Sequence, residues 1–258
     1  NAPHTPFHKP PSNLISNPGL PGTPGHINAN PELYFKAAIE ALDAETGRLI
    51  TYMNQHGLID STNFVFMGDN GNDKRVAQIA DTTHAKGTLY DYGVHVPLLV
   101  AGPDIVQGGR YSDALVSGAD VFATVAEWSG IGSWNQYLPS GTVNDSKSMM
   151  PVLSNDTTDI RSWIFTDQFQ TVPAATDGKT IRNKTYQLIS FDNGNCAFYN
   201  LVNDPAEQVN LLVQGMSTTD SANYRQLLDT LVALVPQTAC SALATSLQQY
   251  NPVAYKVY

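Results

Sequence analysis

Two short apolar runs frame the middle of the chain and predict its central strands. Phe64–Met67 is stopped by Gly68, Asp69 and Asn70, and the mostly apolar residues 96–101 are followed by glycine and proline. Apolar runs of this length, bounded by Gly, Pro, Asp or Asn, are typical of buried strands that end in tight loops. In open α/β sheets, ligands bind just beyond the carboxyl ends of the strands. The loop that carries Asp69 and Asn70 is therefore the first candidate for chemistry.

The spacing of apolar residues changes to that of a helix after Pro31. Asn30 suits the N-cap, proline suits the first turn, and Gly57 suits the position after the last turn. The apolar face expected from the 3.6-residue period consists of Phe35, Ile39, Leu42, Leu49 and Met53. A shorter helix is predicted at Asp120–Trp128. Residues 1–30 are rich in proline, glycine and histidine, which predicts loop rather than helix or strand.

Strand-like segments gather in the last third of the chain. Residues 163–165, 180–191 and 197–201 are rich in aromatic and β-branched side chains, which favour pleated structure. A helix should follow them, and its apolar face consists of Tyr224, Leu227, Leu228, Leu231 and Leu234. We expect this face to pack on the sheet, because an amphipathic helix must bury its apolar stripe.

Composition narrows the class of protein. The chain has 258 residues, of which 42% are hydrophobic, so it can build a substantial core and is not a disordered segment. Its formal net charge of −9 argues against a nucleic-acid groove, which requires a basic surface. No apolar run approaches the roughly 18 residues of a membrane span. The acidic balance still allows an anionic small substrate, which a local cation and a metal can hold.

Longer motifs around these elements occur in a characteristic order. The strand at Phe64–Met67 precedes Asp69-Asn70-Gly71, and Lys86 then opens the pattern Lys-Gly-x-x-Tyr-x-x-Gly-x-x-Val-Pro. Near the start, Pro3-His4-Thr5-Pro6 has the form Pro-His-x-Pro, and residues 199–211 have the form Tyr-Asn-Leu-x-Asn-Asp-Pro-x-Glu-x-x-Asn-Leu. Together these motifs resemble the type I sulfatases, the arylsulfatase-like branch of the alkaline phosphatase superfamily. The resemblance covers nearly the whole chain, but only the carboxyl-terminal half of such a sulfatase.

The resemblance implies an α/β fold with two parts. The first is an alkaline-phosphatase-like sandwich, present here only in part, and the second is a small C-terminal antiparallel sheet with a helix. Residues 1–145 would form the second half of the catalytic α/β domain. Residues 146–258 would form the C-terminal α+β subdomain. An N-terminal half of the same protein would then be a partner of this chain.

The resemblance also implies site residues for a sulfuric ester hydrolase. Lys86 offers a compact cation for the sulfuryl oxygens, and His4 could donate a proton to the leaving alkoxide. Asp69 and Asn70 are hard oxygen donors and would form part of a Ca²⁺ site. The substrate would be a small-molecule or saccharide sulfate ester. Whether that ester is a sugar, aryl or lipid sulfate is left open.

One part of the family's chemistry is absent from the sequence. Sulfatases use a formylglycine made from Cys or Ser in the motif Cys/Ser-x-Pro/Ala-x-Arg, and neither Cys196 nor Cys240 stands in such a motif. The paired aspartates of the family's first strand are absent too. We therefore expect formylglycine on a missing N-terminal half. The 258-residue chain alone should bind Ca²⁺ poorly and should not hydrolyse sulfate esters at an enzymatic rate.

Two alternatives to a sulfatase remain open. Phosphate and phosphonate ester hydrolases of the same superfamily place Asp-His where this chain has Asp69-Asn70, and imidazole suits Zn²⁺ or Mn²⁺ better than an amide oxygen does. Asn70 therefore favours the sulfatase. The other alternative is a non-catalytic sulfatase-like protein that binds a sulfated ligand. An upstream formylglycine motif would distinguish the enzyme from this binding protein.

Two cysteines and three sequons bear on localisation. Cys196 and Cys240 allow one disulfide, but two buried thiols explain them equally well. Asn144, Asn155 and Asn183 each begin an Asn-x-Ser/Thr pattern, which is a weak signal in an Asn-rich chain. With the family resemblance, a bridge would indicate a periplasmic or secreted protein.

Overall fold

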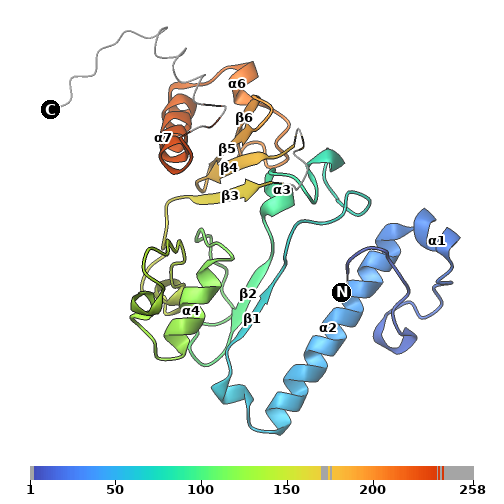
Figure 1. Ribbon diagram of the computed structural model, residues 1–258. Helices are drawn as coiled ribbons and strands as arrows, with labels where there is room; N and C mark the ends of the chain where they lie inside the picture. The colour runs from blue at the N-terminus through green and yellow to red at the C-terminus, as the bar shows by residue number, and fades with distance from the viewer. Residues whose placement is uncertain (1–2, 170–173, 175, 237, 239, 241–258) are drawn as a thin grey trace, which may run out of the picture. The chain divides into compact units, whose positions relative to one another are not determined.

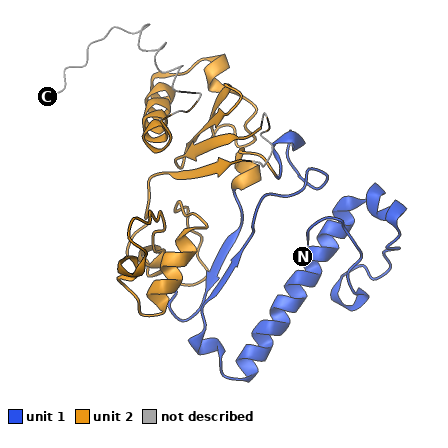
Figure 2. Ribbon diagram, viewed as in Figure 1, with its two compact units in different colours: residues 1–86, 95–105 blue, residues 87–94, 106–258 orange. Residues whose placement is uncertain are grey.

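A computed structural model describes residues 3–169, 174, 176–236, 238 and 240 of this chain (Figure 1). These residues divide into two compact units, which Figure 2 distinguishes by colour. Unit 1 contains residues 1–86 and 95–105, and unit 2 contains residues 87–94 and 106–258. Short antiparallel sheets and helices make up both units, which confirms the predicted α/β class. The predicted domain boundary near residue 145 stays a prediction.

Unit 1 consists of a long helix, a two-stranded sheet and short helical turns. Its elements are 3-10 helices η1 (Ser12–Leu14), η2 (Ile59–Ser61) and η3 (Thr82–His84), helices α1 (Pro24–Ala29) and α2 (Pro31–Gln55), and strands β1 (Phe64–Met67) and β2 (Leu98–Ala101). Helix α2 begins and ends where the sequence predicts, with Pro31 in its first turn and Gly57 at φ +68° just beyond its last. Helix α1 corrects the prediction that residues 1–30 are all loop: Pro24 starts it, because proline fits a first helical turn.

The buried face of α2 differs from the predicted one. Its buried residues are Tyr34, Ala37, Ala38 and Ala41, whereas Ile39 and Leu49 of the predicted face are exposed. Alanines let another segment approach the helix closely, and that segment is the irregular N-terminal stretch. Phe7 and Leu20 from this stretch share a core cluster with Tyr34, Ala37 and Val76. The helix is therefore buried along a small-residue face near its start.

Strands β1 and β2 form at the two predicted apolar runs, but the prediction that they are central is wrong for the described residues, where they form a two-stranded sheet and each is an edge strand. They pair antiparallel, with Phe64 opposite Ala101 and Met67 opposite Leu98. The prediction that the first run is fully buried is wrong for the described chain, because the side chains of Phe66 and Met67 are each 42% exposed. Burial on both faces requires layers on both sides of a sheet, and among the described residues these two strands form a two-stranded sheet.

Unit 2 contains a four-stranded antiparallel sheet in the order β3-β4-β5-β6. Its elements are strands β3 (Ile164–Gln168), β4 (Gly178–Arg182), β5 (Tyr186–Phe191) and β6 (Cys196–Asn200), helices α3 (Asp91–Val94), α4 (Asp120–Trp128), α5 (Met150–Leu153), α6 (Leu211–Gln214) and α7 (Thr218–Leu234), and 3-10 helix η4 (Trp134–Tyr137). The predicted helix at Asp120–Trp128 is confirmed residue for residue. The predicted strand-like segments are confirmed as well, and residues 180–191 contribute to the antiparallel hairpin of β4 and β5.

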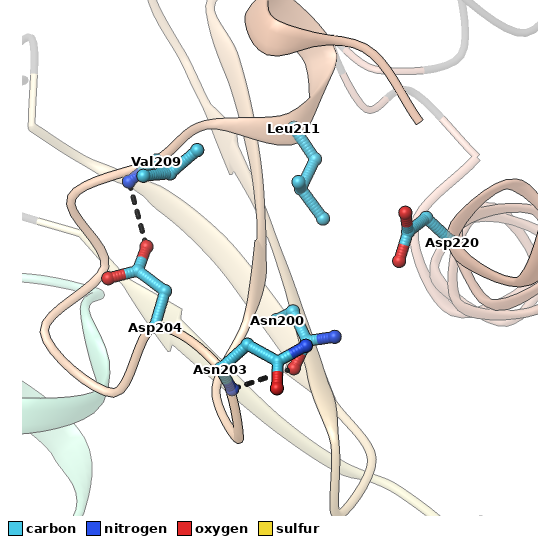
Figure 3. Close-up of a pocket in the computed structure, with 6 residues that line it drawn as sticks. All are labelled: Asn200, Asn203, Asp204, Val209, Leu211 and Asp220. Carbon is cyan, nitrogen blue, oxygen red and sulfur yellow. Dashed lines mark hydrogen bonds between the residues drawn. The ribbon is translucent and has the colours of Figure 1, made fainter. Parts of the chain in front are cut away.

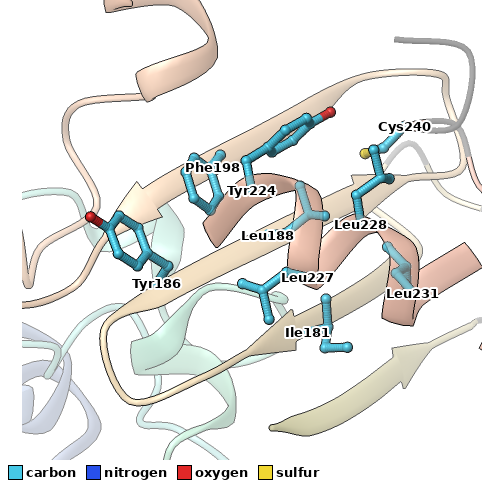
Figure 4. Close-up of a cluster of buried hydrophobic side chains, with 9 residues drawn as sticks. All are labelled: Ile181, Tyr186, Leu188, Phe198, Tyr224, Leu227, Leu228, Leu231 and Cys240. Carbon is cyan, nitrogen blue, oxygen red and sulfur yellow. The ribbon is translucent and has the colours of Figure 1, made fainter. Parts of the chain in front are cut away.

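Helix α7 packs on one face of this sheet, as predicted (Figure 4), but Leu234 of the predicted face is 44% exposed because it lies in the last turn of the helix. Leu227, Leu228 and Leu231 lie over Ile181 and Leu188 of the central strands. The cluster also contains the stacked rings of Tyr186 and Phe198, whose centroids are 5.2 Å apart, together with Tyr224 and Cys240. Ser217 caps the helix in a reciprocal capping box with Asp220.

A disulfide joins Cys196 to Cys240, with a Cα–Cα distance of 5.8 Å, so the question left open by the sequence is answered in favour of a bridge. The bridge connects β6 to the chain beyond α7, and Cys240 is fully buried beside the helix. None of the helices in the described part of the chain is long and apolar enough to cross a membrane.

Candidate functional site

The loop after β1 carries the two predicted metal ligands. Gly68 N donates a hydrogen bond to Pro97 O at 3.0 Å, which ties the start of the loop to the residue before β2. A side chain at position 68 would come within 3.2 Å of Val96 Cβ, so glycine permits this close approach. Asp69 then lies exposed, and Asn70 is half-buried with its Nδ2 donating to Gly71 O at 3.1 Å. With its amide nitrogen engaged by the loop, Asn70 can offer its side-chain oxygen to a cation.

Lys86 lies at the far end of the same loop. Its backbone N donates to Asn72 O at 2.9 Å, which closes residues 72–86 into a loop whose two ends are adjacent. The Lys86 side chain is exposed. Just before it, Asp81 caps η3 by accepting from Thr83 N, and the buried His84 lies 3.7 Å from the Asp81 carboxylate. The predicted cation thus lies at a backbone position fixed next to the predicted metal loop.

His4 belongs to the N-terminal stretch of unit 1. Its side chain is exposed, and its Nδ1 lies 2.5 Å from Thr5 O. Three residues later, Phe7 is buried against Phe35, with ring centroids 6.0 Å apart, and the guanidinium of Arg75 lies 5.0 Å from the centre of the Phe7 ring. Arg75 and its neighbour Val76 lie in the loop that joins Asn70 to Lys86. The stretch that carries His4 therefore packs against the loop that carries the other three residues.

All four predicted residues thus lie in unit 1, on two segments that pack together. In the described part of the chain, their side chains make no hydrogen bond or ion pair with one another. That the four side chains converge on one pocket stays a prediction.

Asp69 and Asn70 offer the type of oxygen ligand that a hard cation prefers, but two residues provide too few ligands to fill its coordination shell. A carboxylate and an amide oxygen are ligands that Ca²⁺ accepts, but Ca²⁺ takes about six to eight oxygens. Among the described residues, no group of three or more His, Cys, Asp or Glu side chains could hold a metal ion. Further ligands would therefore have to come from outside these residues.

Two cavities lie in unit 2. One of about 230 Å³ is lined by Asn200, Asn203, Asp204, Val209, Leu211 and Asp220 (Figure 3). Its polar groups serve the fold: Asp204 accepts from Val209 N at 2.7 Å, and Asn200 accepts from Asn203 N at 3.1 Å. Asp220 accepts from the Tyr186 hydroxyl at 2.7 Å and caps α7. This cavity is thus a by-product of turns and caps.

A second, shallower cavity of about 650 Å³ contains cationic side chains from Lys147, Arg161 and Lys184. Lys184 is paired with Asp159 at 2.7 Å and with Asp113 at 3.2 Å, and Arg161 is paired with the buried Asp120. These carboxylates neutralise much of the positive charge that an anion would need. None of the four predicted site residues lines either cavity.

Two family models match the chain and overlap in its middle. A model described as Sulfatase matches residues 5–131. A model described as N-sulphoglucosamine sulphohydrolase, C-terminal, matches residues 82–233, which is more than half of the chain. Together they include Asp69, Asn70 and Lys86, whereas His4 lies one residue before the first match.

Similar proteins match most of this chain, and each of them is more than twice the length of the matched region. A sulfatase of Formosa agariphila is 23% identical over 250 residues, which is 94% of this chain and 44% of that protein. A structure solved in complex with its substrate D-glucosamine-2-N,6-O-disulfate has a TM-score of 0.62 at 22% identity and covers 78% of this chain and 40% of its own. The structure of a phosphonate monoester hydrolase of Silicibacter pomeroyi has a TM-score of 0.60 at 20% identity. The match covers 86% of this chain and 43% of that hydrolase.

These likenesses confirm the predicted alkaline-phosphatase-like fold. The chain spans less than half the length of each of these proteins. At 22% and 20% sequence identity, the similarity to these two solved structures shows the fold alone.

Proposed function

This chain belongs to the sulfatase family, and on that premise we propose that it forms part of an enzyme that hydrolyses sulfuric esters. The observation that carries the proposal is the packing of the His4 stretch against the loop from Asn70 to Lys86. A proton donor, a cation and two oxygen donors thereby lie on neighbouring segments of one unit. These are some of the groups that sulfate ester hydrolysis requires, the nucleophile and further metal ligands being the others.

Each residue has a role that follows from its chemistry. The Lys86 ammonium would bind the sulfuryl oxygens as a point charge, and it would stabilise the negative charge that moves through the sulfate in the transition state. The protonated His4 imidazole would give its proton to the ester oxygen as the bond from sulfur to that oxygen breaks. The leaving group would then depart as a neutral alcohol or phenol rather than as an oxyanion.

Asp69 and Asn70 would hold part of a Ca²⁺ shell. When bound, this cation would neutralise charge on the sulfate and orient the reacting groups. We further propose that the remaining ligands and the formylglycine nucleophile lie on an N-terminal half of the same protein. The support is that the chain spans 44% of its Formosa relative and contains no formylglycine motif.

The test is turnover of 4-nitrophenyl sulfate by the full-length protein and by the 258-residue chain alone. We expect activity from the former only. In the full-length protein, Lys86→Ala and Asp69→Ala should each lower kcat/KM by about 100-fold or more, which is typical of losing one electrostatic contact to the transition state. Lys74→Ala and Asp60→Ala are matched controls, because both residues are exposed in the same unit. Full activity in either site variant, or turnover by the chain alone, would overturn the assignment.

The same assay separates a sulfatase from the related phosphorus-ester hydrolases. The structural similarity to a phosphonate monoester hydrolase is the reason to test phosphorus-ester hydrolysis as a second candidate function. A sulfatase should prefer 4-nitrophenyl sulfate to 4-nitrophenyl phosphate and to a 4-nitrophenyl phosphonate, and Asn70→His should lower sulfate turnover. A preference for either phosphorus ester would favour the alternative. Tight binding of sulfated ligand without turnover by the full-length protein would indicate the non-catalytic binding protein.

A sulfated saccharide is the substrate class that we propose first. The support is the neighbour solved with its substrate D-glucosamine-2-N,6-O-disulfate. Sulfate release from glucosamine 6-sulfate at a higher kcat/KM than from 4-nitrophenyl sulfate would agree with this, and the reverse order would point to an aryl ester.

We also propose a periplasmic or secreted location for the protein. The Cys196–Cys240 disulfide supports it, because disulfides persist mainly in oxidising compartments. Fractionation of the native host, with the bridge assayed by mass spectrometry before and after reduction, tests this proposal. Recovery in the reduced form from the cytoplasm would contradict it.

A further inference from the structure

The segment that directly follows Lys86 is attached to the four-stranded sheet of unit 2. Gln168 Nε2 donates to Gly87 O at 3.0 Å, and Gln187 Nε2 donates to Leu89 O at 2.8 Å. Gln187 and Leu89 are both fully buried. Residues 87–94 are therefore held by hydrogen bonds to their backbone as well as by side-chain packing.

The alternation of residues along the strands explains which side of the sheet binds residues 87–94. Leu188 of β5 faces α7, whereas its neighbour Ile189 packs with Leu89 on the other side. Gln187 shares the side of Ile189, because side chains in a strand alternate. Arg182 lies opposite Gln187 in the β4–β5 register and so points to the same side. This side therefore presents polar groups to residues 87–94, while the other side presents leucines to α7.

Arg182 and Glu207 complete the attachment at Asp91, where α3 begins. Arg182 forms an ion pair with the Asp91 carboxylate, and both side chains are mostly buried. The Glu207 carboxyl accepts a hydrogen bond from Asp91 N at 2.7 Å and is only 2% exposed. Glu207 reaches this place from the turn after β6, with its own backbone at φ +54°. Asp91 is thus held through its backbone and through its side chain by two different elements.

We propose that Arg182, Gln187 and Glu207 are positioning residues, which fix the backbone on the carboxyl side of Lys86 and so set where its ammonium group can reach. The inference rests on the proposed function, in which Lys86 binds the sulfuryl oxygens. Lys86 N is already fixed to Asn72 O on its other side, so contacts flank the residue in both directions along the chain. The lysine side chain is flexible, so an anchored backbone limits the positions that its ammonium group can take. This matters because a misplacement of a catalytic group by about 1 Å can lower the rate roughly 100-fold.

The first experiment measures order in residues 87–94 by amide hydrogen exchange and needs no activity. In the 258-residue chain, Glu207→Ala and Arg182→Ala should speed exchange at Asp91, Gly93 and Val94 by about tenfold or more. Glu207→Gln keeps an oxygen acceptor for Asp91 N and should retain the protection. The matched control is Tyr186→Phe, which removes a hydrogen bond to Asp220 on the α7 side of the same sheet.

Unchanged exchange at these amides in both alanine variants would overturn the proposal. So would acceleration spread evenly over β4 and β5, because that would indicate loss of the whole unit rather than release of one segment.

The second experiment links the attachment to Lys86 in the full-length protein. Arg182→Ala should lower kcat/KM for 4-nitrophenyl sulfate by about 10- to 100-fold, whereas Tyr186→Phe should stay within about twofold. If Arg182 acts through Lys86, adding Arg182→Ala to Lys86→Ala should cause little further loss. A fully multiplicative loss in the double variant would overturn the positioning role. A wild-type protein without sulfate ester turnover would instead contradict the proposed function, and hydrogen exchange would then decide alone whether the sheet fixes residues 87–94.

Discussion

Glu207→Gln should make unit 2 more stable at alkaline pH, which is unusual for the removal of a charge from a native protein. Burial raises the pKa of the Glu207 carboxyl from 4.5 to about 8, and the nearby Asp91 and Asp204 carboxylates act in the same direction. The hydrogen bond from Asp91 N and the charge of Arg182 oppose this increase but do not cancel it. Glutamine has nearly the same shape and carries no titratable proton.

The sign of the effect follows from proton binding. The folded chain binds the Glu207 proton more tightly than the unfolded chain does, so the stabilising contribution is fully present below pH 4.5. It is lost as pH rises from 4.5 to about 8, where the buried carboxyl ionises. At about 1.4 kcal/mol per pKa unit, the loss has an upper limit of roughly 5 kcal/mol. Relaxation around the ionised group should reduce it to about 2 to 4 kcal/mol.

The assay is urea unfolding of wild type and Glu207→Gln at pH 5, 7 and 9, followed by tryptophan fluorescence. All three tryptophans, Trp128, Trp134 and Trp163, lie in unit 2, so the signal reports on the unit that contains Glu207. Other titrating groups are common to both proteins and cancel in the difference. We expect equal free energies of unfolding near pH 5 and a growing advantage of the variant toward pH 9. Parallel pH profiles, or an advantage that shrinks as pH rises, would refute this account of Glu207.

Three further predictions concern stability. Reducing the Cys196–Cys240 bridge, which closes a loop with a sequence separation of 44, should lower the free energy of unfolding by about 4 kcal/mol, measured in urea with and without reductant; an unchanged midpoint would contradict it. Leu188→Ala, at a fully buried position, should lower the free energy of unfolding by about 3 to 4 kcal/mol. Leu99→Ala, at a side chain of β2 that is 59% exposed, should lower it by less than about 1 kcal/mol in the 258-residue chain. Equal losses in the two variants would contradict the exposure of β2. Ser217→Ala should cost about 1 kcal/mol in thermal unfolding, because it breaks the capping box of α7; a Ser217→Ala protein as stable as wild type would rule out that role.

The sequence alone determined the elements that depend on local signals. Proline in the first turn and glycine after the last residue mark the ends of α2, and the apolar period marks α7. The motifs around Asp69, Lys86 and residues 199–211 were sufficient to indicate the family, because each lies within one short stretch of chain. The fold class followed from these elements and motifs together.

Only the tertiary structure decided which surfaces are buried and which distant residues meet. The face of α2 that packs is the alanine face around Tyr34, because the irregular N-terminal stretch lies there, and periodicity cannot show what an irregular segment covers. The attachment of Asp91 to Arg182 and Glu207 spans 91 and 116 residues of sequence, so no local pattern could reveal it. The cysteine pairing was equally hidden, since two cysteines in a sequence do not show whether their Cα atoms approach to 5.8 Å. Local conformation is encoded by neighbours in sequence, whereas burial, pKa and pairing depend on what the fold brings beside each residue.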